Sequence, residues 1–398
     1  MPATLSPTAQ MPSVPVLFFS LVLCLLGAVS NLASGAPITP TRDDEVVDVL
    51  PAVNGNRTEA RRLRRQLAEQ PRDSTLALSV AKRYLDQAHA LGDPRFAGMA
   101  ISVIAPWGDD ATAPDDVLLM RATLQQYLHE FDASAASLQR LLARPGAPRP
   151  QAGLTLATVR RVQGRYAESD IACRGVAAAG AALHASACLA ENAALRGEVD
   201  QARGVFERLL GGARNPPATQ AWLTTSLAEL EQRAGRDAAA EAAFKAALRL
   251  DADAYTVLAY ADFLIEQTRP AEAIAALKRE PRSDAVLLRL AIAGSAARAD
   301  SAAADVGEMR ERIALANERP DAKIFHGREQ AMFALAVDHD AARALELARG
   351  NVAQQREPLD LLVFAQTARA SGRPEAIAEG KRLAHSQGLV DRRIEALW

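Results

Sequence analysis

The histidines and cysteines of this chain are the residues whose chemistry could support catalysis or metal binding. The histidines are scattered, with no two at metal-ligand spacing on one helix and no His-Glu-x-x-His motif. The nearest groupings are His326 with Glu329 and the run Asp338-His339-Asp340, and a solvated turn or helix face accounts for each. Glycine-rich phosphate loops, Gly-x-Ser-x-Gly elbows and Cys-x-x-Cys pairs are also absent from the sequence. We therefore predict no catalytic residue, no metal and no cofactor, and we do not expect an enzyme.

The composition predicts closely packed helices that present polar side chains. Of the 398 residues, 49% are hydrophobic, 24% are charged and only 5% are aromatic, and alanine makes up much of the apolar fraction. Alanine is the best helix former and the smallest residue that packs between helices. The length exceeds that of one compact domain, so the chain is either two domains or a solenoid. The formal net charge of −2 lacks the excess of positive charge that phosphate contacts need, so we expect no nucleic-acid partner.

The first 36 residues form a segment of their own. An apolar run over residues 14–29, followed by small residues up to Ala36, is typical of a secretory signal peptide. No lysine or arginine precedes the run, and residues 14–33 are long enough to span a bilayer, so an uncleaved membrane anchor is the alternative. Residues 37–70 are polar and arginine-rich, which predicts a linker. We expect a periplasmic or otherwise exported protein, or one anchored to the inner membrane by its N-terminal segment.

From about residue 74 onward, a turn residue recurs between short alanine-rich helical stretches. We place these turns at His129, Gly164, Gly197, Gly235, Thr268 and Gly372, and the first five are separated by 35, 33, 38 and 33 residues. A large apolar residue followed by alanine precedes the turns, and a small residue with a larger one four positions later follows them. Helical spacing places these residues on one face, where two antiparallel helices can pack. Examples are Leu189-Ala190, Leu227-Ala228, Ala202 with Phe206, and Ala240 with Phe244.

This pattern resembles the tetratricopeptide-repeat family, whose period is about 34 residues. The resemblance implies an all-α fold, a right-handed α-solenoid of helix-turn-helix repeats over residues 71–398. It is clearest over residues 115–285, with degenerate pairs at 74–107, 285–350 and 357–397. The tryptophan, tyrosine and proline of the family consensus are mostly absent. A non-repetitive helical bundle is the alternative fold.

Two cysteines fall on neighbouring repeats of such a solenoid. Cys173 lies on the second helix of one repeat and Cys188 on the first helix of the next, with a turn near Gly180 midway between them. An antiparallel arrangement brings the two side chains close, so in an oxidising compartment we expect a disulfide. The alternative is two buried thiols that act as small hydrophobic residues. Cys24 lies in the apolar N-terminal run and would leave with a cleaved signal peptide.

In the tetratricopeptide family the first helix of each repeat lines a concave groove, and the resemblance assigns eight side chains to it. Five of them follow the alanine at the helix seam in successive repeats, namely Thr123, Thr158, Glu191, Glu229 and Asp262; the others are Arg161, Trp222 and Tyr255. Three carboxylates with aromatic neighbours are typical of a hot spot for a basic peptide. The alternative is a solvated face that needs carboxylates for solubility.

These features favour a scaffold or adaptor in the cell envelope that binds a protein or peptide in the concave groove. If the anchor is retained, residues 14–33 would tether the protein to the membrane. A second hypothesis is a structural subunit of an envelope assembly, such as a secretion or polysaccharide-export system, with apolar patches near Leu397-Trp398. A third is a metal-handling or enzyme accessory protein, which would need His326, His339 and a carboxylate to converge.

Overall fold

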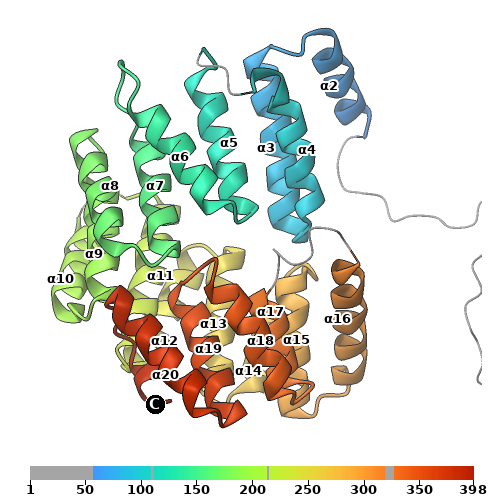
Figure 1. Cartoon of the computed structure of the whole chain (residues 1–398), viewed down its shortest axis with the longest axis vertical. Coiled ribbons are helices and arrows are strands. Elements are labelled where there is room, and N and C mark those ends of the chain that lie inside the picture. The colour runs from blue at the N-terminus through green and yellow to red at the C-terminus, as the bar shows by residue number, and fades with distance from the viewer. Residues whose placement is uncertain (1–56, 109–111, 213–214, 319–326) are drawn as a thin grey trace, which may run out of the picture. The chain divides into compact units, whose positions relative to one another are not determined.

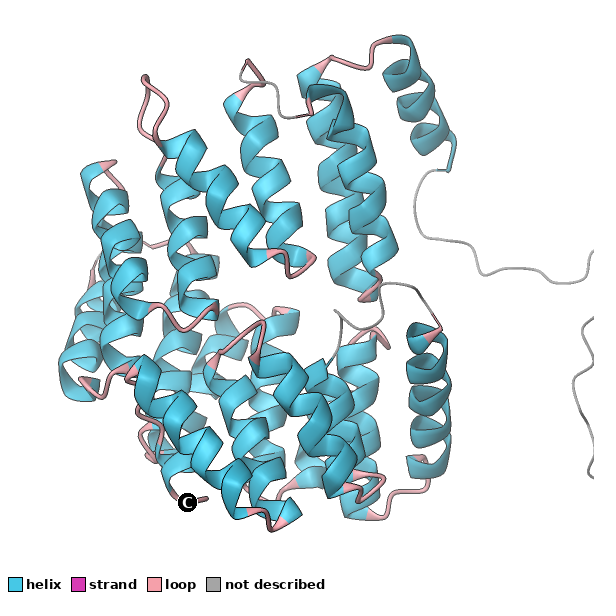
Figure 2. Ribbon diagram, viewed as in Figure 1, coloured by secondary structure: helices cyan, strands magenta, loops and turns pink. Residues whose placement is uncertain are grey.

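The computed structural model describes residues 57–398 apart from 109–111, 213–214 and 319–326. The predicted signal peptide or anchor at 1–36, including the tether at 14–33, lies outside the described residues, as does the linker up to residue 56. Contacts divide the chain into residues 1–58 and a compact unit from Glu59 to Trp398. The described residues form helices, turns and loops, with no strand among them (Figure 2). Within this part of the chain, no helix is long and apolar enough to cross a membrane.

The helices follow one another as pairs joined by short turns (Figure 1). A single helix, α2 (Arg57–Glu69), precedes the pairs and lies in the predicted linker. The first five pairs are α3 (Ser74–Leu91) with α4 (Pro94–Ile104), α5 (Asp115–Tyr127) with α6 (Phe131–Leu142), α7 (Pro150–Val162) with α8 (Tyr166–Ala178), α9 (Ala182–Leu195) with α10 (Val199–Gly211), and α11 (Pro217–Arg233) with α12 (Asp237–Leu250). The remaining pairs are α13 (Ala254–Glu266) with α14 (Pro270–Leu277), α15 (Asp284–Ala297) with α16 (Ala302–Asn317), α17 (Gly327–Ala336) with α18 (Ala341–Val352), and α19 (Pro358–Ser371) with α20 (Pro374–Gln387). A 3-10 turn, η1 (Ala105–Trp107), follows α4, and α21 (Arg392–Glu395) follows α20.

Each turn within a pair contains one residue with a left-handed backbone. This conformation is free of strain only in glycine, because a Cβ crowds the following carbonyl group. Five of the turns use glycine and four use another residue, in the order Gly92, His129, Gly164, Gly197, Gly235, Thr268, Arg298, His339 and Gly372. All six turn residues named from the sequence are among them.

Small residues bring the two helices of a pair into contact. Ala202 and Phe206 of α10 are fully buried, and so are Ala240 and Phe244 of α12. Where serine is the small residue at this contact, its side chain also forms a hydrogen bond to the partner helix. The hydroxyl of Ser169 in α8 donates to the carbonyl oxygen of Ala157 in α7 at 2.8 Å. This repeated packing confirms the predicted all-α solenoid of helix-turn-helix repeats.

Cys173 of α8 and Cys188 of α9 form a disulfide that joins neighbouring pairs. Their Cα atoms lie 5.9 Å apart, and both side chains are buried. A disulfide stabilises a fold mainly by restricting the unfolded chain, by about 3 kcal/mol for a loop of this length. The bond therefore reinforces the contact between the α7–α8 pair and the α9–α10 pair.

The C-terminal segment returns to the turns of pairs far earlier in the sequence. The amide of Arg356 donates to the carbonyl oxygen of Val162 at 2.7 Å, and the amide of Val390 donates to that of Leu195 at 2.8 Å. Buried side chains from both regions share one hydrophobic cluster. In an ordinary solenoid each repeat contacts only its neighbours. Here the C-terminal segment also contacts the ends of α7 and α9 and the turns that follow them.

The chain end itself is part of this packing. Leu397 and Trp398 are partly buried against the C-terminal hydrophobic cluster. The Trp398 ring lies so close to Gly380 of α20 that a Cβ there would come within 3.1 Å of its Cζ2 atom. These two side chains therefore contribute to the core of the unit.

Candidate functional site

The eight predicted groove residues all lie on first helices of their pairs. They are Thr123 on α5, Thr158 and Arg161 on α7, Glu191 on α9, Trp222 and Glu229 on α11, and Tyr255 and Asp262 on α13. We call the surface formed by these residues the inner face. Its charged members contact the first helix of the next or preceding pair, so the inner face forms a connected row.

Glu191 is held between two neighbouring first helices. Its carboxylate forms an ion pair with Arg161 of α7 and accepts a hydrogen bond of 2.8 Å from the hydroxyl of Ser226 of α11. The side chains of Arg161 and Glu191 expose only 24% and 16% of their surfaces, so solvent screens their interaction weakly. The negative charge of Glu191 is therefore neutralised within the protein.

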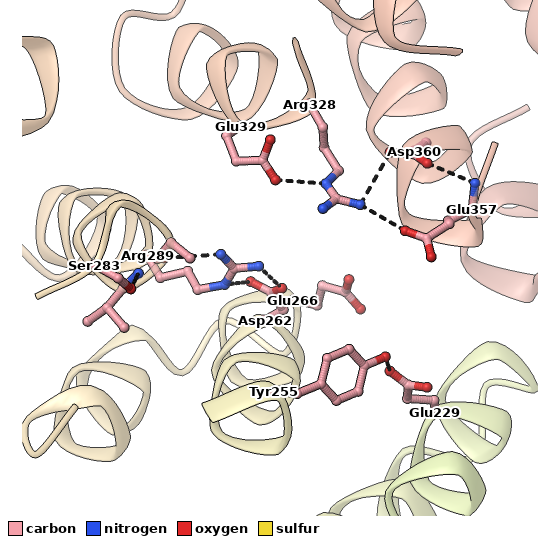
Figure 3. A network of polar contacts seen from close by, with 12 residues as sticks. Glu229, Tyr255, Asp262, Glu266, Ser283, Arg289, Arg328, Glu329, Glu357 and Asp360 are labelled. Carbon is pink, nitrogen blue, oxygen red and sulfur yellow. Dashed lines mark hydrogen bonds and ion pairs between the residues drawn. The ribbon is translucent and has the colours of Figure 1, made fainter. Parts of the chain in front are cut away.

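Glu229 has a different kind of partner. The hydroxyl of Tyr255 donates to Glu229 Oε1 at 2.5 Å (Figure 3). Burial raises the pKa of the Glu229 carboxyl, an effect that the nearby Arg233 cation opposes. The charge of Glu229, together with restricted hydration, raises the pKa of the Tyr255 hydroxyl well above its ordinary value. Tyr255 nevertheless exposes 63% of its surface.

Asp262 is paired along the same row. Arg289 of α15 donates to both of its oxygens, at 2.8 Å from Nε and 2.6 Å from Nη2 (Figure 3). Such a bidentate pair fixes the geometry of both groups. Of the three predicted groove carboxylates, Glu191 and Asp262 thus have an arginine partner. The third, Glu229, accepts a hydrogen bond from the hydroxyl of Tyr255.

The other inner-face residues make local contacts. The Trp222 ring stacks on His184 of α9, with 5.7 Å between the ring centroids. The hydroxyls of Thr123 and Thr158 donate to carbonyl oxygens of their own helices, at 3.0 and 3.1 Å. The structure therefore places the predicted aromatic residue Tyr255 in a hydrogen bond with Glu229, whereas Trp222 contacts His184. The two threonines form hydrogen bonds within their own helices.

A second group of polar side chains belongs to α17 and to the segment that leads into α19. We call the surface formed by Arg328, Gln355 and Glu357 the opposite wall. Arg328 Nη1 lies 3.3 Å from Glu357 Oε2 and also 3.3 Å from Asp360 Oδ1 (Figure 3). Asp360 is buried, and this burial raises its pKa to about 6. The amides of Asn351 and Gln355 donate to it at 2.8 and 3.1 Å, which holds this wall in place.

A cavity of about 550 Å³ lies between residues of the early pairs, α3 to α7, and residues of the late pairs, α15 to α17 with the segment before α19. Its lining includes Thr123, Gln126 and Val162 from early pairs and Arg328, Gln355 and Glu357 from late pairs. The cavity is large enough for side chains of a ligand. Of the predicted groove residues, Thr123 borders it.

The histidine-based alternative finds no support among the described residues. This part of the chain contains no group of three or more His, Cys, Asp or Glu side chains placed to hold a metal ion. His339 occupies the exposed turn between α17 and α18. His326 lies outside the described residues, so the convergence of His326 and His339 that this alternative would need is not tested.

Sequence reasoning missed several partners of the inner face. Arg289 lies 27 residues after Asp262, and Ser226 lies 35 residues after Glu191. A search for polar residues about one repeat apart could have found both, because first helices of successive repeats lie side by side. Nothing in the sequence pattern marks Glu357, which reaches this region only through the return of the C-terminal segment.

No protein-family model matches the chain, and no curated protein matches it in sequence. Among similar solved structures, a Rap protein complexed with competence and sporulation factor has a TM-score of 0.49 at 11% identity, covering 86% of this chain and 93% of that one. A tetratricopeptide repeat protein from Parabacteroides merdae has a TM-score of 0.37 at 10% identity, covering 77% and 99%. PilF of Pseudomonas aeruginosa has a TM-score of 0.37 at 15% identity, covering 53% and 96%. Similarities this distant do not indicate what the chain binds.

Proposed function

We propose that the chain is a non-catalytic scaffold that binds a protein or peptide through its inner face. The observation that carries this proposal is the row of polar side chains on consecutive first helices, with an exposed aromatic residue at Tyr255. A solenoid offers an extended surface of this kind to a polypeptide. Tyrosine is enriched among the residues that dominate binding energy because it combines a large apolar ring with a hydrogen-bonding group.

Glu229 is the position at which a basic side chain of the partner would bind. Arg161 and Arg289 already neutralise Glu191 and Asp262. Within the described residues, Glu229 has a hydrogen bond from Tyr255 but no ion pair. A lysine or arginine of the partner could therefore pair with Glu229 without displacing an internal cation.

The proposed setting is an exported compartment of the cell envelope. The disulfide between Cys173 and Cys188 supports this setting, because such bonds persist in oxidising compartments and are rare in the cytosol. Attachment to the inner membrane through residues 14–33 is the alternative within this proposal. A role as a structural subunit has less support, since Leu397 and Trp398, expected to form an apolar patch, pack into the core.

Site-specific photocrosslinking in envelope extracts tests the proposal. A photoreactive phenylalanine analogue would replace Tyr255 in one full-length variant and Ile171 of α8 in another. The two residues are matched in exposure, at 63% and 64%, but Ile171 lies on a second helix. We expect crosslinked polypeptides from position 255 that are weak or missing from position 171, and we expect Glu229→Lys to reduce them. Equal yields at both positions, or none at 255, would contradict the proposal.

A further inference from the structure

Glu357 belongs to the last pair of the solenoid but lies beside the inner face of the early pairs. The amide of the preceding residue, Arg356, donates to the carbonyl oxygen of Val162 at the end of α7. Arg161, which pairs with Glu191, is the residue just before Val162 in that helix. The contact between these two backbone segments therefore fixes the position of Glu357 opposite the inner face.

The carboxylate of Glu357 is only partly satisfied by the protein. Its side chain exposes 42% of its surface, and it forms a capping box with Asp360 at the start of α19 and a single ion-pair contact of 3.3 Å with Arg328. Arg328 divides its donors among three carboxylates, because it also contacts Glu329 and Asp360. Glu357 thus retains capacity to accept a hydrogen bond from another cation.

Glu357 and Glu229 face the same space. In Figure 3 the Tyr255–Glu229 pair and Glu357 extend from different helices toward a common region. The electrostatic effects agree, since the charge of Glu229 and, more weakly, that of Glu357 raise the pKa of the Tyr255 hydroxyl. Two like charges that face the same space favour a cation between them.

We propose that Glu357 completes the binding site from the opposite wall, so that a basic side chain of the bound polypeptide lies between Glu229 and Glu357. This inference rests on the proposed function and specifies the residue type that the site selects. An arginine suits such a site well, because its planar group carries five N–H donors and can contact two carboxylates at once. The cavity beside Glu357 provides room for neighbouring residues of the same polypeptide.

The proposal distinguishes this site from a groove formed by neighbouring repeats alone. The inner face is formed by successive first helices from α5 to α13, whereas Glu357 joins it only because residues 356–394 pack back onto the ends of α7 and α9. Binding would then depend on this return contact as well as on the inner face. A ligand that bridges the two walls would also stabilise the return contact, because it binds only the packed arrangement.

Selection from a phage-displayed library of random peptides tests the proposal with the full chain. We expect the wild-type protein to enrich peptides that contain lysine or arginine. Glu357→Gln and Glu229→Gln should each weaken binding of the selected peptides by roughly tenfold, the loss expected for one charged hydrogen bond. Glu375→Gln, an exposed carboxylate on α20, is the matched control and should leave both enrichment and affinity unchanged.

Glu357 precedes α19 directly, so its substitution could also disturb the fold. Glu357→Asp keeps the charge and should recover most of the preference for basic peptides, while circular dichroism reports whether each variant is folded. If Glu229→Gln removes the preference and Glu357→Gln does not, the site has one wall and the inference is wrong, while the proposed function stands. If the wild-type protein enriches no peptide over a Tyr255→Ala variant, the proposed function itself is wrong.

Discussion

Arg393 of α21 forms an ion pair with Glu266 of α13, with 3.2 Å between Nη1 and Oε1, although 127 residues separate them in the sequence. Gln232 of α11 donates to the other oxygen of Glu266 at 2.7 Å, and Asp391 accepts from Arg393 at 2.7 Å. Burial raises the pKa of Glu266, and the Arg393 cation opposes that effect. This group of polar residues fastens the end of the chain to its middle.

Arg393→Gln should lower the free energy of unfolding. The variant leaves Glu266 partly buried without its cation, and the expected loss is about 1–3 kcal/mol. Urea denaturation followed by circular dichroism would measure it. Arg382→Gln, at an exposed arginine on α20, should change the unfolding free energy by less than about 0.5 kcal/mol. Equal effects of the two substitutions would show that the Arg393 ion pair does not stabilise the fold.

Gly164→Ala should destabilise the protein more than Gly372→Ala. Both glycines have a left-handed backbone, with φ of 73° and 64°, so alanine adds about 1–2 kcal/mol of strain at either site. A Cβ on Gly164 would in addition overlap the side chain of Gln387, whereas nothing lies within 4 Å of a Cβ on Gly372. The difference between the two unfolding free energies therefore measures the contact with the C-terminal segment. Adding Gln387→Ala should remove that difference, and a difference that remains would assign it to another cause.

Reduction of the disulfide should shift the unfolding transition to lower urea concentration. The loop between Cys173 and Cys188 has a sequence separation of 15, for which the expected loss is about 3 kcal/mol. Unfolding curves with and without dithiothreitol would show the shift. The Cys173→Ala/Cys188→Ala variant should be insensitive to dithiothreitol. Superimposable wild-type curves in the two conditions would contradict a stabilising disulfide.

Glu229→Gln should stabilise the protein at pH 7 and have less effect near pH 4. The pKa of Glu229 is raised in the folded protein, first of all by burial. A carboxyl with a raised pKa binds protons more tightly in the folded state, so its contribution to stability is present at low pH and is lost as the pH rises through the folded pKa. The ionised group therefore costs stability at neutral pH, and glutamine removes this cost.

Urea unfolding of wild type and Glu229→Gln at the two pH values measures this effect. Glu229→Asp, which keeps an ionisable group, should retain a pH dependence of stability that the glutamine variant lacks. A glutamine variant less stable than wild type at pH 7 would mean that the hydrogen bond from Tyr255 outweighs burial. A carboxylate retained despite a cost in stability is typical of a functional position.

The sequence by itself determined the helical class and the repeated turn. Glycine spacing, alanine seams and small-to-large pairs such as Ala240 and Phe244 are local signals, because each pair packs mainly against residues within one repeat length. The same locality placed Cys173 opposite Cys188 and assigned Glu191, Glu229 and Asp262 to first helices. These assignments need only the helix period and the order of the repeats.

Only the tertiary structure decided which charges are paired and where the chain end lies. Whether Asp262 reaches Arg289 depends on the rotation between neighbouring pairs, which spacing alone does not specify. The approach of Glu357 to the inner face depends on small rotations that accumulate over successive pairs until the C-terminal segment meets the ends of α7 and α9. No local sequence pattern specifies the total of these rotations, so the opposite wall could not be predicted from the sequence.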